Sequence, residues 1–183
     1  FGDDAGTPPG TLHIAVLRSQ YASGKIIKLD TSMASCIPGV HSIIDGKSFA
    51  EISKPLLSVL RIDIEVWPCA IEYVRYVGEP IALILADDRY IAEDAVENIK
   101  VSYEEYTPII NTLKATLDDA PKVHNKIKSN VVSDRKFSYG NPKEAFKKAY
   151  KIVELEVEYP RNSCTPLEGF VVQSHYNAAD KNY

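Results

Sequence analysis

The chain has 183 residues, of which 45% are apolar and 25% are charged, and its formal net charge at pH 7 is -4. These values are ordinary for a soluble globular protein with a sizeable buried core. An acidic chain without a basic cluster is not expected to bind nucleic acid. Its apolar runs fall far short of the roughly 20 residues of a membrane span, and no basic and apolar leader opens the sequence, so we expect a cytoplasmic protein.

The first part of the chain is expected to form three short strands. Thr31 or Ser32 can cap a short helical turn over residues 33–37. The pair Asp45-Gly46 is typical of a turn. The three predicted strands are residues 12–18, 25–30 and 40–45.

A short helix and a further strand are expected next. Phe49, Ile52 and Leu56 have helical spacing, which Pro55 interrupts. Residues 61–67 alternate between apolar and polar, which favours a strand whose apolar side faces the core. That side holds Ile62, Ile64 and Val66.

The clearest pattern of the chain lies in residues 74–108. Residues 81–86 are an unbroken apolar run, typical of a short strand buried on both faces. Asp87 and Asp88 follow, where a carboxylate caps the next helix. Residues 100–104 then alternate, which predicts a second strand. The apolar side of the helix between these strands holds Ile91, Ala92, Ala95, Val96 and Ile99.

A connector follows this strand-helix-strand unit. Residues 113–117 have the pattern of a short helix, and the stretch after them has no sustained period. A long irregular crossing is unusual inside one compact domain, so we place a domain boundary near residue 112. The predicted domains are residues 1–112 and residues 113–183.

The C-terminal part is expected to contain a helix and two strands. Asn141 can cap a helix that begins at Pro142. Residues 152–159 then alternate, with Val153, Leu155, Val157 and Tyr159 inward and Glu154, Glu156 and Glu158 outward. Residues 170–176 predict another strand. A turn at residues 177–182 would lead to a returning strand that begins at Tyr183.

The cysteines and histidines are scattered. Cys36, Cys69 and Cys164 are odd in number and widely spaced, so they predict no disulfide framework, zinc site or iron-sulfur motif. We expect reduced, buried thiols. The histidines form no metal-ligand pair on one helix face, and the glycines have no phosphate-binding spacing. The histidines are His13, His41, His124 and His175.

A family resemblance is strongest in residues 75–109, RYVGEPIALILADDRYIAEDAVENIKVSYEEYTPI. This string resembles the large, molybdenum-binding subunit of the molybdenum hydroxylases. That family holds the aerobic carbon monoxide dehydrogenases, xanthine dehydrogenases and aldehyde oxidoreductases. The similarity is to its N-terminal hammerhead domain. The resemblance implies an α/β (α+β) fold in which a mixed sheet packs with short helices.

Further segments are similar to the same family. GTLHIAVLRS and GKIIKLDTS resemble the two strands that open the hammerhead domain. GNPKEAF and PRNSCTPLEGFVV resemble the first helix and strands of the molybdenum-cofactor-binding domain. The resemblance covers most of residues 2–176.

The resemblance implies an activity for a larger protein. Members of the family hydroxylate a substrate at a molybdenum-pterin centre and pass electrons through 2Fe-2S clusters to FAD. Their pterin-binding loop, the glutamine near the metal and the catalytic glutamate lie beyond the part that this chain resembles. We therefore expect an N-terminal fragment of a carbon monoxide or aldehyde dehydrogenase-like large subunit, with no catalytic, cofactor-binding or metal residues of its own. The implied partners are the rest of that subunit, the 2Fe-2S and FAD subunits or domains, and a second copy of the complete enzyme.

Acidic residues in the best-matched segment have simpler interpretations than chemistry. Glu79, in Val77-Gly78-Glu79-Pro80, could be a general base, but the string also makes a turn and starts a strand. Asp87 and Asp88 could bind a divalent cation, but helix capping explains both. Glu93, Asp94 and Glu97 are interpreted as a solvated helix face.

Other candidates lie near the C terminus. Cys164, His175 and Asp180 are the residue types of a nucleophile, its base and an orienting group. Arg161 could bind an anionic group or form a local ion pair. Glu168 matches a glutamate of a Pro-Leu-Glu-like motif in the family, and that glutamate is not the catalytic one.

Two other functions compete with the fragment hypothesis. The chain could be a stand-alone, non-enzymatic module that assembles a split oxidoreductase. It could also be an unrelated small hydrolase, which requires Cys164 and His175 within hydrogen-bond reach. Carbon monoxide, an aldehyde and a purine all remain open as substrates of the larger enzyme.

Overall fold

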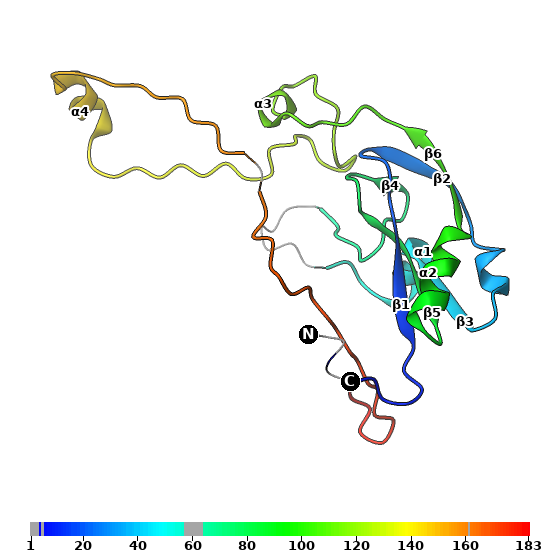
Figure 1. The fold of residues 1–183 in the computed structure, drawn as a ribbon. Helices are drawn as coiled ribbons and strands as arrows, with labels where there is room; N and C mark the ends of the chain where they lie inside the picture. The colour runs from blue at the N-terminus through cyan, green and yellow to red at the C-terminus, as the bar shows by residue number, and fades with distance from the viewer. Residues whose placement is uncertain (1–3, 5, 57–63, 161) are drawn as a thin grey trace. The chain divides into compact units, whose positions relative to one another are not determined.

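The structure, a computed structural model, describes residues 4, 6–56, 64–160 and 162–183 (Figure 1). Its contacts divide the chain into two units. One unit is Gly10–Arg135, and the other combines Phe1–Pro9 with Lys136–Tyr183. The domain boundary near residue 112 lies inside the first unit and stays a prediction. Among the described residues, no helix is both long enough and apolar enough to cross a membrane.

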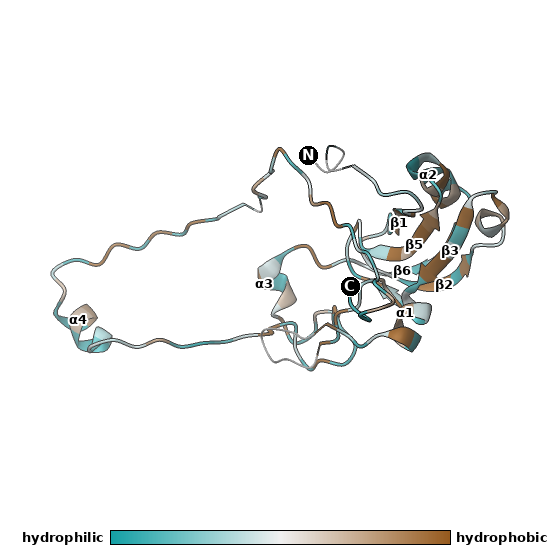
Figure 2. Cartoon of the chain, turned by 90° about the horizontal axis from the view of Figure 1, so that it is seen from below, coloured by the Kyte–Doolittle hydropathy of each residue, from teal (hydrophilic) through white to brown (hydrophobic). Residues whose placement is uncertain are grey.

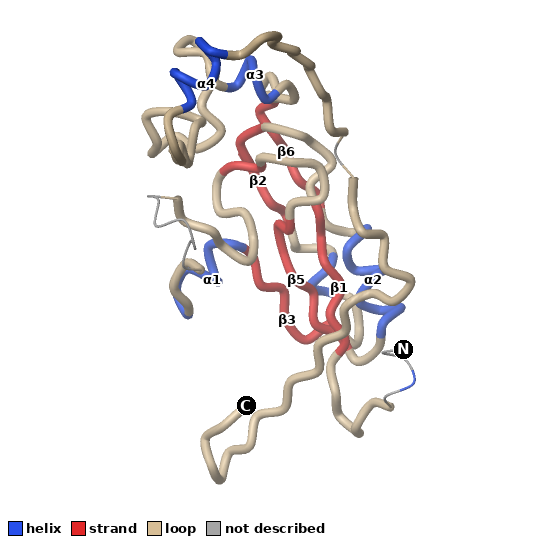
Figure 3. The backbone as a smooth tube through the Cα atoms, turned by 90° about the vertical axis from the view of Figure 1, so that its left-hand side faces the viewer, coloured by secondary structure: helices blue, strands red, loops and turns tan. Residues whose placement is uncertain are grey.

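The unit Gly10–Arg135 contains two antiparallel sheets, drawn in red in Figure 3. In the described residues each sheet has three strands. The first has the order β1 (His13–Arg18), β5 (Pro80–Ala86), β3 (Val40–Asp45). The second has the order β4 (Tyr73–Val74), β2 (Gly24–Asp30), β6 (Lys100–Glu105). The predicted α/β class is confirmed, and so are the strands expected at β1, β2, β3, β5 and β6. The expected mixed sheet differs, because the strands described pair antiparallel in two separate sheets.

Strand β5 is the centre of its sheet. Leu83 pairs with Val16 of β1 on one side and with Ile44 of β3 on the other. Both faces of β5 are covered, as its unbroken apolar sequence predicts, and Figure 2 shows hydrophobic residues along β5 and β3. The buried residues of β5 are Ile81, Ala82, Ile84 and Ala86.

Helix α2 (Arg89–Glu97) covers this sheet and packs against β1 and β5 (Figure 1). Ala92 and Ala95 are fully buried, and their small side chains let the helix approach the strands closely. The predicted apolar face is confirmed. Capping was predicted for both Asp87 and Asp88, and it is confirmed for Asp88, whose Oδ1 accepts a hydrogen bond of 2.8 Å from the backbone N–H of Ile91. It is wrong for Asp87, whose carboxylate pairs with His41 instead.

The core connects the two sheets. One buried cluster centres on Ile84 and Ala95, and a second centres on Val74 and Ile81. Leu17 of β1 and Leu29 of β2 pack against both clusters. The second sheet is thereby fixed to the first, so the segments that border β4 have a rigid support.

The region after β3 differs from the sequence prediction. Asp45-Gly46 does not form a separate turn, because Asp45 caps helix α1 (Gly46–Ile52) and its Oδ1 accepts a 2.8 Å hydrogen bond from the N–H of Ser48. The helix ends at Ile52. Leu56 lies outside it and forms an isolated antiparallel bridge with Val66.

The strand predicted at residues 61–67 is only partly open to comparison, because residues 57–63, Ile62 among them, lie outside the described part. The described remainder is not a regular strand, and Val66 is 45% exposed instead of facing the core. The prediction is wrong there. Val66 pairs only with Leu56, in an isolated bridge, and not with a regular strand. Alternation in the sequence therefore did not determine which way the Val66 side chain faces.

Shorter elements agree with the predicted positions. The helical turn expected at residues 33–37 is the 3-10 helix η2 (Ala34–Cys36), and the helix expected at residues 113–117 is α3 (Thr112–Ala115). In the second unit, Asn141 caps α4 (Pro142–Lys148) through the N–H of Glu144, as predicted.

The strands predicted at residues 152–159 and 170–176 are wrong for this structure. Both segments are exposed, and neither pairs with a strand among the described residues. Two isolated strands are at best marginally stable, so a sheet needs a third strand or a packing partner. The turn at residues 177–182 is confirmed by a bridge between Asn177 and Asn182, but Tyr183 begins no strand.

Candidate functional site

A cleft of about 670 Å³ lies in the unit Gly10–Arg135. Concave sites with apolar walls and a few convergent polar groups are where small ligands usually bind. We therefore take this cleft as the candidate site. Two stretches of chain form most of its walls: residues 64–76 around β4, and residues 122–126 of the connector after α3.

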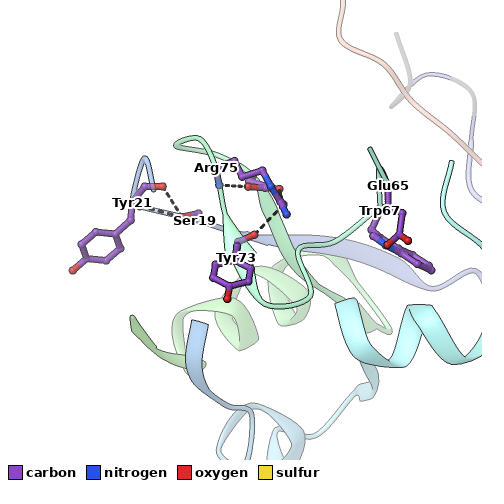
Figure 4. Close-up of polar contacts among 7 residues, drawn as sticks. Ser19, Tyr21, Glu65, Trp67, Tyr73 and Arg75 are labelled. Carbon is purple, nitrogen blue, oxygen red and sulfur yellow. Dashed lines mark hydrogen bonds and ion pairs between the residues drawn. The ribbon is translucent and has the colours of Figure 1, made fainter. Parts of the chain in front are cut away.

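The turn before β5 places Glu79 beside Arg75 at the cleft, and Figure 4 labels Arg75 there. One carboxylate oxygen of Glu79 accepts a hydrogen bond from the backbone N–H of Arg75, and the other lies 3.4 Å from Nη1 of Arg75. Nη1 also donates to the carbonyl oxygen of Tyr73 at 3.2 Å. The Glu79 side chain is 12% exposed. Burial raises the pKa of Glu79, and the hydrogen bonds and charge of Arg75 oppose that rise.

Ser19 fixes the same turn from the other side. Its backbone N–H donates to the carbonyl oxygen of Glu79, and its own carbonyl oxygen accepts from the N–H of Gly78, both at 2.8 Å. Gly78 has a φ of +91°, which glycine adopts without strain. The predicted turn and strand start are confirmed. The oxygens of Glu79 serve that turn, which favours a structural role over a general base.

The connector contributes the opposite wall. Nζ of Lys126 lies 2.9 Å from one oxygen of Glu65, and Nε1 of Trp67 donates to the other at 3.4 Å (Figure 4 shows Glu65 beside Trp67). The hydrogen bonds from Lys126 and Trp67 lower the pKa of Glu65. Burial, and then the positive charge of Arg75, lower the pKa of His124. Both effects favour the neutral form of the His124 imidazole.

The cleft can bind polar groups, but its described residues include no activated nucleophile. Cys69 lines the cleft, and burial, followed by the charge of Asp45, raises its pKa to about 11. Its thiol is therefore protonated at neutral pH and is a poor nucleophile. Nε of Arg75 is buried without a hydrogen-bond acceptor in the described part of the chain.

The acidic residues considered from the sequence have separate partners. Oδ1 of Asp87 lies 2.7 Å from Nε2 of His41, whereas Asp88 caps α2. Glu93 pairs with Arg89 at 2.8 Å on the exposed side of α2, as predicted for a solvated face. In the described residues, no group of three or more His, Cys, Asp or Glu side chains is placed to hold a metal ion.

The C-terminal candidates are not brought together. No hydrogen bond joins Cys164, His175 and Asp180 in the described residues, and Asp180 instead accepts a 2.7 Å hydrogen bond from Asn177. The requirement of the small-hydrolase hypothesis is not met. Glu168 is exposed, and Arg161 lies outside the described residues.

The prediction of three buried thiols is wrong for two of them. Cys69 is buried, but Cys36 and Cys164 are exposed. Cys36 ends the short helix η2, and Cys164 lies among exposed residues of the second unit. A cysteine is buried by its packing partners, and the spacing of cysteines in the sequence does not reveal them.

The residues that form the cleft were not foreseen. Lys126 and Glu65 are 61 positions apart, so no local spacing connects them. The sequence signal that was available is the length of the connector, because a long irregular segment that stays with a compact domain is often functional.

The sequence of this chain is similar to proteins of known function. Residues 1–107 match the family model described as "Aldehyde oxidase and xanthine dehydrogenase, a/b hammerhead domain". The chain is 30% identical over 173 residues to the carbon monoxide dehydrogenase large chain of Hydrogenophaga pseudoflava, a match covering 87% of this chain and 21% of that protein. It is 29% identical over 147 residues to the nicotinate dehydrogenase large molybdopterin subunit of Eubacterium barkeri, covering 80% of this chain and 33% of the relative.

A solved structure has a similar fold. The crystal structure of quinoline 2-oxidoreductase from Pseudomonas putida 86 matches with a TM-score of 0.65 and 32% identity, over 71% of this chain and 17% of that one. The chain thus spans about a fifth of the carbon monoxide dehydrogenase large chain and a third of the nicotinate dehydrogenase subunit.

Proposed function

Because this chain belongs to the family of aldehyde oxidase and xanthine dehydrogenase hammerhead domains, we propose that it is a structural, N-terminal part of a molybdenum hydroxylase large subunit and is catalytically silent by itself. The larger subunit is of the carbon monoxide or aldehyde dehydrogenase type. In this proposal the chain works in the cytoplasm, with the rest of its subunit and with 2Fe-2S and FAD subunits or domains, in an enzyme that is a homodimer.

One observation carries the proposal. The family match, residues 1–107, includes both sheets and α2, and two of the acidic residues considered there for chemistry have structural roles. Glu79 holds a turn and Asp88 holds a helix end. The relatives that share this part are several times longer than this chain. That difference favours a structural role for this part within a larger protein.

The cofactor is inferred from the relatives of this chain. The described residues of this chain do not offer a site for it. One relative, from Eubacterium barkeri, is a large molybdopterin subunit by name. The described residues here offer no set of metal ligands, and the cleft has a guanidinium that is already paired with Glu79. We therefore assign the molybdenum-pterin cofactor to the rest of the large subunit and derive no chemical step from this chain.

Metal analysis and turnover assays test the proposal. The purified chain is expected to contain no stoichiometric molybdenum, to lack cofactor absorption in the visible region, and to turn over neither aldehydes, purines nor carbon monoxide. A complete molybdenum hydroxylase, handled in the same way, is the positive control. Stoichiometric molybdenum in the chain, or turnover of any of these substrates, would contradict the proposal.

A non-enzymatic assembly module is the second candidate. It is favoured by the large apolar side chains that the C-terminal unit leaves exposed, Phe170 and Leu155 among them. The reading frame downstream of this segment discriminates the two candidates. Codons that continue through a cofactor domain support the large-subunit proposal, whereas a natural stop supports the module.

A further inference from the structure

His124 is a half-buried histidine of the connector, and it lines the cleft. Its carbonyl oxygen accepts a 3.2 Å hydrogen bond from the backbone N–H of Ile127. In the part of the chain that the structure describes, neither ring nitrogen forms a hydrogen bond or an ion pair. Polar groups away from water are ordinarily hydrogen-bonded, so this ring lacks the contacts that would stabilise its charged form.

Positive charges surround this ring. Arg75 acts on it from the wall around β4, and Lys122 and Lys126 line the same cleft on either side of it in the sequence. Arg75 is fixed in place, because its backbone N–H is bonded to Glu79 and its Nη1 donates to the carbonyl oxygen of Tyr73 at 3.2 Å. A protonated His124 would therefore meet like charges that cannot all move away.

The carboxylates of the cleft do not compensate such a charge. Glu79 pairs with Arg75, and Glu65 pairs with Lys126. Glu72 also lines the cleft, but it is exposed and forms no ion pair with His124, and the charge that acts on the ring is that of Arg75. The other titratable side chains of the cleft are thiol and phenol groups, which gain no positive charge in acid: Cys69, Tyr73, Tyr76 and Tyr106.

The closed connector therefore disfavours proton binding by His124. Burial, and then the charge of Arg75, lower the pKa of the ring below its ordinary 6.5. Both causes disappear when the connector leaves the cleft, so the open form binds the proton more tightly than the closed form does. The closed form is favoured above pH 6.5 and loses that advantage as the pH falls through the lowered pKa.

We propose that His124 is a pH-sensitive switch of the connector, and that protonation of its ring releases residues 122–126 from the wall around β4 and opens the cleft. The 2.9 Å ion pair between Lys126 and Glu65 joins exposed side chains, so it opposes this release only weakly. Glu65 stays ionised in mild acid, because the hydrogen bonds from Lys126 and Trp67 lower its pKa. This inference concerns the connector and is independent of the proposed molybdenum hydroxylase function.

Hydrogen exchange of the full chain, corrected for the intrinsic effect of pH on exchange, tests the proposal. We expect the protection of the Ile127 amide to fall by about threefold to tenfold between about pH 7.5 and pH 5.5, because proton binding shifts the opening equilibrium. The amides of β5 should keep their protection, since they report on the whole unit. Acrylamide quenching of Trp67, which lines the cleft and contacts Glu65, should increase over the same interval.

Two variants and a matched control identify the group that titrates. His124→Gln is neutral at every pH and should lose the response. His124→Lys is charged at every pH and should be open in neutral solution as well. The control His41→Gln removes an exposed histidine that does not line the cleft, and it should respond as the unmodified chain does. Glu79, whose pKa burial raises, is present in all three variants, so its titration cannot explain a response that His124→Gln lacks.

Several results would overturn the proposal. The connector is no switch if its exchange and the quenching of Trp67 are the same at both pH values. His124 is not the group that titrates if His124→Gln keeps the response, or if His124→Lys stays closed in neutral solution. A loss of protection in β5 that parallels the loss in the connector would mean that acid unfolds the whole unit.

Discussion

Gly46 starts helix α1 against the backbone of a neighbouring segment. A β-carbon at this position would come far inside van der Waals contact with the carbonyl oxygen of Ala70, and it would lie 2.9 Å from that of Cys69. Backbone oxygens cannot move aside as the end of a long side chain can. We expect Gly46→Ala to lower the free energy of unfolding by about 1–3 kcal/mol through overpacking, although alanine favours helix more than glycine does.

Urea unfolding, followed through Trp67, the single tryptophan of the chain, measures the effect of this substitution. The matched control is Lys47→Ala, at the next and exposed position of the same helix. That variant should stay within about 0.5 kcal/mol of the unmodified chain. If the urea midpoint of Gly46→Ala is unchanged, then the start of the helix does not pack tightly against the backbone of Cys69 and Ala70.

Glu79 gives the chain a pH-dependent stability. Burial raises its pKa above the ordinary 4.5, so the folded state holds this proton more tightly than the unfolded state does. The stability that the protonated Glu79 side chain adds to the folded state is therefore fully present below pH 4.5. It is lost as the pH rises through the pKa of Glu79 in the folded state. We expect Glu79→Gln to remove this fall in stability.

The measurement is the free energy of unfolding at several pH values from acid to neutral. Glu93→Gln, which removes a carboxylate from the exposed face of α2, is the control and should keep the slope of the unmodified chain. If Glu79→Gln has the same slope as well, then Glu79 does not titrate as its burial implies, and the turn does not respond to pH.

At the scale of the element, helix α2 depends on one capping carboxylate. Asp88 accepts the N–H of Ile91 at 2.8 Å, whereas its neighbour Asp87 accepts no backbone N–H of the helix and pairs with His41 on the surface. Asp88→Ala should therefore cost about 1 kcal/mol of stability. Asp87→Ala should cost less, since an exposed ion pair contributes about 0–1 kcal/mol. Equal losses in urea unfolding of the two variants would contradict the assigned cap.

The elements that could be predicted from the sequence are those whose signal is local. Strand β5 has a continuous apolar run, and helices α2 and α4 each have a periodic face or a capping asparagine or aspartate. Such signals act within a few residues, so they survive in any surroundings. The resemblance to the hammerhead family depends on the same local strings and is confirmed.

The elements that could not be predicted depend on distant partners. Residues 152–159 have the pattern of a strand, but a strand needs a neighbour to complete its hydrogen bonds, and the described residues provide none. The cleft could not be predicted either, because one of its walls depends on a contact between Lys126 and Glu65, which are 61 positions apart in the sequence. Alternation specifies two faces of a segment and says nothing about what covers them.

At the scale of the whole molecule, one asparagine holds the connector in its folded form and ties it to the end of α3. Oδ1 of Asn130 accepts a 2.9 Å hydrogen bond from the N–H of Val123, and Nδ2 donates to the carbonyl oxygens of Ala115 at 3.0 Å and Pro121 at 2.9 Å. We propose that the hammerhead domain ends near residue 112. The connector then lies outside that domain and packs on its surface.

Limited trypsin digestion of the full chain tests how firmly the connector is held. Proteases cut where the chain opens locally, so the exposed lysines at positions 143, 147 and 151 should be cut first, leaving a fragment that retains the connector. Asn130→Ala removes all three hydrogen bonds, and cleavage after Lys122 and Lys126 should then become faster. Asn141→Ala, which alters only the cap of α4, should leave cleavage in the connector unchanged. Early cleavage after Lys122 in the unmodified chain would mean that the protected unit ends near residue 112 and that the connector is not part of it.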